Sequence, residues 1–283
     1  KAVQQTCADS DGLINDPRQC KFDPVSLQCD AAVSDPKNSL QCLSNAEVGM
    51  LQKWYAGPQS SDGRKLHVEG VPLGSERSWR GSGGKSLWRL LMEAYAHYLM
   101  FDPAPGPDYD ILQFDLDKDL ARIKRMAAMW SPTDPDLSKF NANNGKLIIY
   151  SGWADPFATP LTPIAYYDEV EKTVGGRQAT QSFTRLFMVP GMNHCGSPDK
   201  NSPAIDARGI DPLTALEQWV ERGVPPDALL TTKFDQHNQV EWQRPVCRYP
   251  LQARYQSFGD RSKAASWVCK EITPTEDTKG PSR

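Results

Sequence analysis

The chain has 283 residues, 39% hydrophobic and 9% aromatic, so it is long and apolar enough for one large domain or two of ordinary size. Its formal net charge of −3 gives no electrostatic reason to expect a nucleic acid or an anionic membrane as a partner. No apolar run approaches the roughly 20 residues that a membrane-spanning helix needs. The chain begins at Lys1 without an initiator Met or a signal-peptide pattern, which predicts a processed or internal segment of a longer protein.

The first 45 or so residues show little periodicity and are rich in cysteine, which predicts an irregular segment cross-linked by disulfides. Three cysteine pairs lie close together in the sequence: Cys7 and Cys20, Cys29 and Cys42, and Cys247 and Cys269. Each closed loop of this size would contribute about 3 kcal/mol in the chain-entropy model, and such clustering favours an oxidising compartment, secreted or periplasmic. The pairing is a hypothesis, because sequence alone does not determine connectivity. Cys195 is left over, which suggests a partner in another chain or elsewhere in a precursor; a free buried thiol is the alternative.

Residues 46 to about 135 alternate helical stretches with polar turns. A helix is predicted over 87–100, where apolar side chains recur at helical spacing, and another over 117–130, ending before Ser131-Pro132. The glycine-rich stretch around Ser82 is predicted to be a flexible turn, because no apolar strand precedes it as a nucleophile elbow requires.

From about residue 140 the pattern changes to strand, helix, strand, helix, which predicts an α/β fold. Short apolar runs at 146–150 and 185–189 predict two strands with a helix between them. A second helix is predicted to begin after Asp211, whose side chain can cap it, with Leu213, Leu216 and Val220 facing inward.

A polar side chain follows each predicted strand: Asp155 after the first and His194 after the second. Ligands of open parallel sheets bind at this edge, and a carboxylate that holds an imidazole in one tautomer is the acid–base pair of a serine hydrolase. Taken singly, Asp155 is better interpreted as a turn or cap residue and His194 as a hydrogen-bonded loop histidine; the catalytic interpretation depends on both residues following strands in this order. The nucleophile is missing, because no Gly-x-Ser-x-Gly occurs and Ser151 belongs to the loop of Asp155. A metal hydrolase using His194 and Cys195 is a weak alternative, since adjacent residues seldom bind one ion.

Several segments of the sequence carry a resemblance to known proteins. They are Tyr150-Ser151-Gly152-Trp153-Ala154-Asp155-Pro156, Val189-Pro190-Gly191-Met192-Asn193-His194-Cys195, Asp11-Gly12-Leu13-Ile14-Asn15-Asp16-Pro17-Arg18-Gln19-Cys20, Phe114-Asp115-Leu116-Asp117, Arg244-Pro245-Val246-Cys247 and Trp267-Val268-Cys269. Over nearly its whole length the chain resembles the C-terminal part of the tannase and feruloyl esterase family. The Gly-Met-Asn-His-Cys element is the most specific of these motifs.

The resemblance implies the C-terminal half of an α/β-hydrolase core at residues 139–283, with a large, irregular, mixed α+β lid at 1–138. It assigns Asp155 as the triad acid and His194 as the triad base. It also implies a disulfide between Cys195 and a cysteine directly before the nucleophilic serine. This chain has no Cys-Ser-x-Gly-Gly segment, so the serine and its cysteine are expected on an N-terminal partner chain of the same precursor.

The family often binds calcium in a loop between the cysteines that match Cys7 and Cys20. The resemblance therefore implies a structural Ca²⁺ held by Asp9, Asp11 and the backbone carbonyl of Leu13, since calcium prefers carboxylate and carbonyl oxygens. The loop is shorter than the family pattern, which argues against the ion. No cofactor is expected for catalysis itself.

The implied activity is that of a serine-type carboxylic-ester hydrolase acting on aromatic esters with gallate, hydroxycinnamate or terephthalate-like acyl groups. Trp153 and Phe157 flank the acid and are candidate substrate contacts, although core packing explains them equally well. The three tryptophans Trp54, Trp79 and Trp88 form either a substrate wall or the core of the lid. The alternative function is a non-catalytic chain that binds an aromatic ligand and keeps a vestigial triad.

Overall fold

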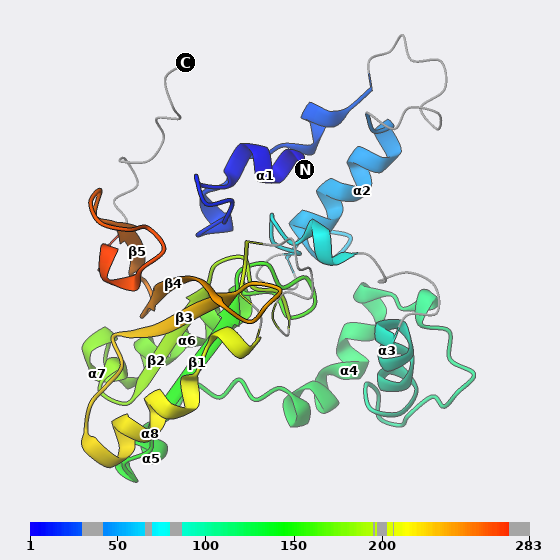
Figure 1. Ribbon diagram of the computed structural model, residues 1–283. Coiled ribbons are helices and arrows are strands. Elements are labelled where there is room, and N and C mark those ends of the chain that lie inside the picture. Colours follow the sequence, from blue (N-terminus) through cyan, green and yellow to red (C-terminus); the bar gives the residue numbers. More distant parts are fainter. Residues whose placement is uncertain are drawn as a thin grey trace. The chain divides into compact units, whose positions relative to one another are not determined.

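The computed structural model describes residues 1–29, 42–65, 70–79, 87–194, 196, 203–205 and 207–271 (Figure 1). Contacts divide the chain into two compact units. Unit 1 comprises Lys1–Phe22, Pro72–Ser75 and Pro135–Arg283, and unit 2 comprises Asp23–Val71 and Glu76–Asp134. This grouping differs from a division at residue 138 chiefly in the first 22 residues, which belong with the C-terminal part. That unit 2 acts as a lid stays a prediction.

Unit 1 holds all of the named strands of the described chain. Its helices are α1 (Ala2–Cys7), α5 (Ser138–Ala142), α6 (Leu161–Val174), α7 (Arg177–Gln181) and α8 (Pro212–Arg222), with 3₁₀ turns at Pro17–Gln19, Ala207–Gly209 and Ala264–Ser266. Its strands are β1 (Leu147–Gly152), β2 (Thr184–Val189), β3 (Ala228–Phe234), β4 (Val240–Cys247), β5 (Gln252–Tyr255) and β6 (Trp267–Lys270). β1 and β2 pair in parallel, whereas β3 with β4 and β5 with β6 form antiparallel pairs.

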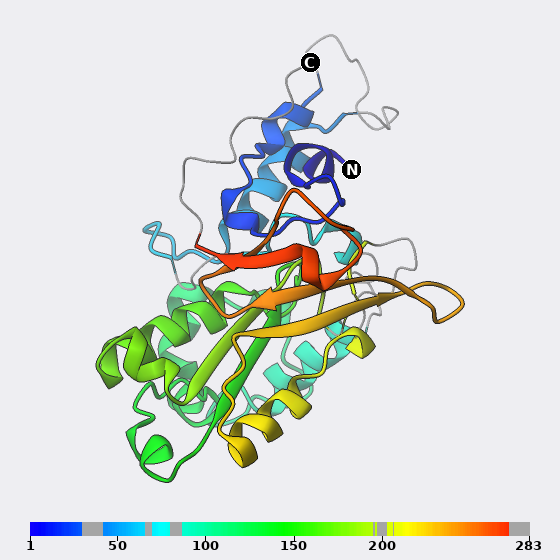
Figure 2. The same ribbon diagram turned by 60° about the vertical axis from the view of Figure 1, so that its left-hand side comes forward.

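The strand β2 is buried along its whole length, as expected for a parallel strand covered on both faces. Its side chains alternate between two core clusters: Leu186 packs with Tyr167 of α6, whereas Phe187 lies in the other cluster, which Ala215 of α8 joins. Figure 2 shows α6 and α8 on opposite sides of the two parallel strands. This layering confirms the predicted α/β fold.

The helix α8 is capped as predicted, but it directs a different face toward the core than the sequence suggested. Asp211 accepts a hydrogen bond from the first turn, and the helix ends at residue 222. The expectation that Leu213, Leu216 and Val220 face inward is wrong for Leu213 and Val220, which are 64% and 60% exposed, whereas Leu216 is half-buried. The bulky indole of Trp219 takes the inner position instead, with the guanidinium of Arg185 4.9 Å from its ring centre.

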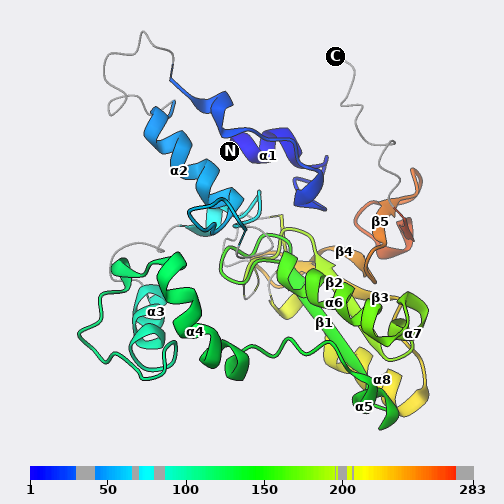
Figure 3. The ribbon, with the colours of Figure 1, turned by 180° about the vertical axis from the view of Figure 1, so that it is seen from behind.

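Unit 2 is mainly helical where it is described. Its helices are α2 (Asn45–Ala56), α3 (Leu87–Tyr98) and α4 (Leu116–Trp130), with 3₁₀ turns at Pro24–Leu27, Glu76–Trp79 and Ile111–Gln113. α3 and α4 confirm the two predicted helices, and Figure 3 shows them near each other. Trp54 and Trp79 contact each other with ring centres 4.9 Å apart, so at least part of their surface packs inside this unit.

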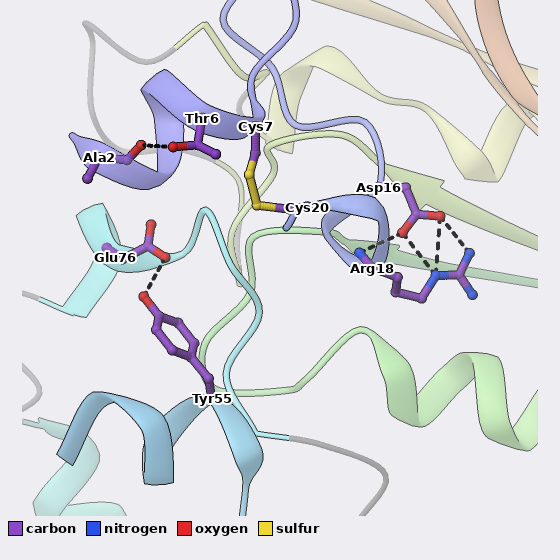
Figure 4. Close-up of a disulfide and its surroundings, with 8 residues drawn as sticks. All are labelled: Ala2, Thr6, Cys7, Asp16, Arg18, Cys20, Tyr55 and Glu76. Atoms are coloured by element: carbon purple, nitrogen blue, oxygen red, sulfur yellow. Dashed lines mark hydrogen bonds and ion pairs between the residues drawn. A yellow bond between two sulfur atoms is a disulfide. The ribbon is translucent and has the colours of Figure 1, made fainter. Parts of the chain in front are cut away.

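Among the described residues, disulfides join the three cysteine pairs that the sequence suggests. The Cα–Cα distances are 5.2 Å for Cys7–Cys20, 4.9 Å for Cys29–Cys42 and 5.6 Å for Cys247–Cys269. Cys247–Cys269 links β4 to β6, and Figure 4 shows Cys7–Cys20. The pairing hypothesis is thus confirmed. Cys195 and Ser82 lie outside the described residues.

In the part of the chain that the structure describes, no helix has the length and apolarity needed to cross a membrane.

Candidate active site

Asp155 lies in the loop that follows β1 and is only 4% exposed. Its Oδ1 accepts hydrogen bonds from the backbone N–H groups of Phe157 (2.8 Å) and Ala158 (3.0 Å). Asp155 therefore is a turn-forming aspartate, one of the two roles considered from the sequence. Because Oδ1 is held by the turn, the second oxygen is fixed in direction and available to another partner.

That partner is His194, in the loop that follows β2. Its Nδ1 lies 2.9 Å from Oδ2 of Asp155. An ionised carboxylate only accepts hydrogen bonds, so Nδ1 donates, and the neutral ring then carries its acceptor lone pair on Nε2. The histidine side chain is 38% exposed, whereas that of Asp155 is 6% exposed. The geometry joins a buried, fixed carboxylate to a solvent-accessible base.

The two loops are also joined through the main chain. The N–H of Trp153 donates to Val189 (2.9 Å), and the N–H of Ala154 donates to Met192 (2.9 Å). These bonds continue the parallel pairing of β1 and β2 beyond the ends of the strands. Gly152 allows this approach, since a Cβ at that position would lie 2.1 Å from the carbonyl oxygen of Met192.

We expect Gly152→Ala to separate these loops, because the added methyl group would overlap a backbone atom that cannot rotate away. The free energy of unfolding should fall by about 1–3 kcal/mol, the usual cost of overpacking. Urea denaturation followed by circular dichroism measures this. Gly49→Ala is the matched control, since a Cβ there meets nothing within 4 Å in the helix α2. A Gly152→Ala protein as stable as the control would contradict the close approach.

The two aromatic residues beside the acid have different surroundings. Trp153 is 3% exposed and packs in the core cluster with Ile164 and Leu186. Phe157 is 37% exposed, and its ring stands edge-on to the ring of His194 with centres 5.9 Å apart. Of the two, Phe157 is the one placed to touch a molecule that approaches the histidine.

An ion pair between the partly exposed Arg18 and the buried Asp16, beside the ring of Trp153, was not expected from the sequence. Arg18 donates to Asp16 (Nη2 to Oδ2, 2.6 Å) and to the hydroxyl of Tyr249 (3.2 Å), as Figure 4 shows for Asp16. Its guanidinium lies 5.0 Å from the ring centre of Trp153. Burial disfavours the charge of Arg18, but the hydrogen bond and charge of Asp16 outweigh it and raise the pKa of Arg18. The signal in the sequence is the Asp-Pro-Arg run, which carries the family resemblance.

The oxygen atoms expected to bind calcium are all turned toward N–H groups. Asp9 accepts from the backbone of Asp11 and Leu13 and from the amide of Asn15, and Asp11 lies between two arginine side chains. The carbonyl of Leu13 accepts from the N–H of Asp9. A cation would have to displace neutral N–H donors from Asp9 and Leu13 and would face two guanidinium groups at Asp11, so the residues do not fit the ion. The described residues contain no group of three or more His, Cys, Asp or Glu side chains that could hold a metal.

Comparison with known proteins gives a consistent match. The family model described as tannase and feruloyl esterase matches residues 1–270. An uncharacterized esterase of Xanthomonas campestris pv. campestris is 32% identical over 92% of the chain and 51% of its own length. A mono(2-hydroxyethyl) terephthalate hydrolase of Piscinibacter sakaiensis is 28% identical over 92% of the chain and 48% of its own length.

Among solved structures, feruloyl esterase B from Aspergillus oryzae superposes with a TM-score of 0.78 at 26% identity. The match covers 95% of this chain and 55% of that one. The chain thus spans about half the length of the relatives it matches.

Proposed function

Because the chain belongs to the tannase and feruloyl esterase family, we propose that it supplies the acid and the base of a serine-type carboxylic-ester hydrolase. The observation that carries this proposal is the 2.9 Å hydrogen bond between Nδ1 of His194 and the buried Oδ2 of Asp155. It gives the imidazole the tautomer that a general base needs, with the accepting nitrogen on the side away from the carboxylate.

In the proposed reaction, Nε2 of His194 removes the proton of a serine hydroxyl as its oxygen attacks the ester carbonyl. The resulting imidazolium then gives that proton to the leaving alcohol, and an acyl-serine remains. Water attacks the acyl-serine in the same way, with His194 again as the base, and the acid is released. Asp155 stays ionised throughout, orients the ring and stabilises the imidazolium.

We assign the nucleophilic serine to an N-terminal segment outside this chain. Three observations support the assignment: the sequence has no Gly-x-Ser-x-Gly, the relatives are about twice as long, and Cys195 follows the base directly. The segment would carry a cysteine next to the serine and form a disulfide with Cys195. Such a bond would tie the nucleophile to the loop of the base, where an error of about 1 Å can cost a hundredfold in rate.

We expect the 283-residue chain alone to have no measurable esterase activity, because loss of a triad serine costs about a millionfold in turnover. The complete protein should hydrolyse esters, and non-reducing peptide mass spectrometry should join Cys195 to a peptide that contains Cys-Ser. Strong activity of the isolated chain, or a free Cys195 thiol in the complete protein, would overturn the two-segment arrangement.

The proposed substrates are esters of aromatic acids. The names of two relatives, a feruloyl esterase and a mono(2-hydroxyethyl) terephthalate hydrolase, support this class, as does the exposed ring of Phe157 beside the base. A panel of methyl gallate, methyl ferulate and a terephthalate monoester, with an aliphatic ester as the control, tests it. Binding of these compounds without hydrolysis would favour an aromatic-ligand binding protein instead. We further propose an oxidising location, secreted or periplasmic, which the disulfides support.

A further inference from the structure

The loop of residues 9–13 is closed by its own hydrogen bonds. Oδ1 of Asp9 accepts from the N–H groups of Asp11 (2.9 Å) and Leu13 (3.1 Å), and Oδ2 accepts from the amide of Asn15 (2.9 Å). The N–H of Asp9 donates to the carbonyl of Leu13 (2.9 Å). The loop therefore has a shape defined by its own hydrogen bonds, and the oxygens of the Asp11 carboxylate bond to other partners.

Asp11 binds two arginine side chains from the far end of the chain. Nη2 of Arg244 on β4 and Nη2 of Arg261 lie 2.8 Å and 2.9 Å from Oδ2 of Asp11. Arg244 is 7% exposed at its side chain, and its guanidinium lies 3.9 Å from the ring centre of Trp267. The Nε and Nη1 groups of Arg244 have no hydrogen-bond partner among the described residues. The buried charge of Arg244 therefore depends on Asp11.

The same loop packs against the segment that carries the base. Leu13 is 3% exposed, and a Cβ placed on Gly191 would lie 2.8 Å from its Cδ2 atom. Gly191 has φ +68, lies in the turn that follows β2 and precedes His194 by three positions. The Leu13 side chain thus lies against the start of the loop whose far end holds the imidazole.

We propose that Asp11, bound by Arg244 and Arg261, is a positioning residue that holds Leu13 against Gly191 and so fixes the loop of His194. The two guanidinium groups do this without a metal ion, because they supply the positive charge that a calcium ion would bring. The effect on catalysis rests on the function proposed above, whereas the effect on the loop does not.

Hydrogen exchange with mass spectrometry on the complete protein tests the inference directly. In Asp11→Asn the amides of residues 191–194 should exchange about tenfold faster, while the helix α6 stays unchanged, because only the local opening of the loop becomes easier. Leu13→Ala should accelerate the same peptide with Asp11 intact. Asp260→Asn is the matched control: this exposed carboxylate next to Arg261 accepts a hydrogen bond from Ser262 within its own turn.

Kinetics provide the second measurement. For Asp11→Asn and Leu13→Ala we expect kcat to fall about 10–100-fold with KM within about twofold, since a displaced base affects the reaction more than binding. A purely structural role would instead lower the melting temperature and accelerate exchange throughout the chain. Unchanged exchange at 191–194 and unchanged kcat in both variants would overturn the proposal. Faster loop exchange in a protein without esterase activity would leave the positioning role intact and contradict only the proposed function.

The proposal that the arginine side chains hold the loop without a metal ion is tested separately, by measuring the effect of calcium. Excess EDTA and added CaCl₂ should leave the melting temperature of the complete protein unchanged, and calorimetric titration with CaCl₂ should show no binding. A melting temperature that falls with EDTA and is restored by calcium, but is insensitive to Asp11→Asn, would show that a cation and not the arginine pair holds the loop.

Discussion

His194→Gln should lower kcat of the complete protein by about a millionfold, the size of loss found when the base of a catalytic triad is removed. Glutamine keeps a polar side chain of similar length, and its amide can still donate to Oδ2 of Asp155, so the fold should be retained. It cannot take a proton from a serine hydroxyl at neutral pH. Steady-state hydrolysis of an aromatic ester, with circular dichroism as the test of folding, measures the effect.

His237→Gln is the matched control for this substitution. His237 lies in the turn between β3 and β4, where its backbone N–H, not its ring, donates to Asp235. The same change of side chain there should leave kcat within about twofold, as is usual for exposed sites without a specific role. If His194→Gln retains a tenth or more of the activity, His194 is not the base.

Asp155→Asn should lower kcat by about ten-thousandfold with a small effect on KM. The amide oxygen can still accept from Phe157 and Ala158, so the turn is preserved. The amide nitrogen then faces Nδ1 of His194, which can form a hydrogen bond only as an acceptor. The imidazole proton therefore moves to Nε2, and the ring can no longer accept a proton from serine. Nitrogen-15 NMR of the imidazole reports this change of tautomer.

Asp235→Asn controls for the loss of a turn-forming carboxylate. Asp235 also accepts two backbone hydrogen bonds through one oxygen, from His237 and Gln239, both at 2.8 Å. Its substitution should reduce stability slightly and leave kcat unchanged. Equal losses of activity in Asp155→Asn and Asp235→Asn would mean that the turn, and not the pairing with His194, matters for hydrolysis.

The pairing of Asp155 with His194 could be predicted because it depends on regular geometry. Two short apolar runs with a helix between them require parallel strands, and the ends of such strands meet at one edge of the sheet. The resemblance added the roles of the two residues. The hydrogen bonds that hold Asp155 could also be predicted, since an Asp before Pro commonly forms a turn.

The surroundings of Asp11 could not be predicted in this way. Its partners Arg244 and Arg261 are 233 and 250 positions away, and no local pattern connects residues at that separation. A carboxylate in a short polar loop suits a calcium ion and a guanidinium equally well at the level of sequence. The fold decides between them, because it alone brings β4 and the segment before β6 to this loop.

The hairpin of β3 and β4 was not predicted from the sequence, for a different reason. In β3 the buried positions alternate as expected, but they are Leu229, Thr231 and Lys233. Two of these three are polar, so the period-two hydrophobic signal is lost. Thr231 is accommodated because its hydroxyl donates to the carbonyl of Arg244 at 2.7 Å. From its sequence pattern, a strand of this kind is interpreted as a loop, because the strand that pairs with it is not known.

The main-chain bonds between the two loops have a consequence for engineering. Since backbone atoms of Ala154 and Met192 hold acid and base together, the spacing of the pair does not depend on which side chains line the approach. The ring of Phe157 lies beside that approach, and its backbone N–H donates to Oδ1 of Asp155. Substitutions at position 157 could therefore change the preference for acyl groups, while the hydrogen-bonded pair of Asp155 and His194 would be the same in every variant.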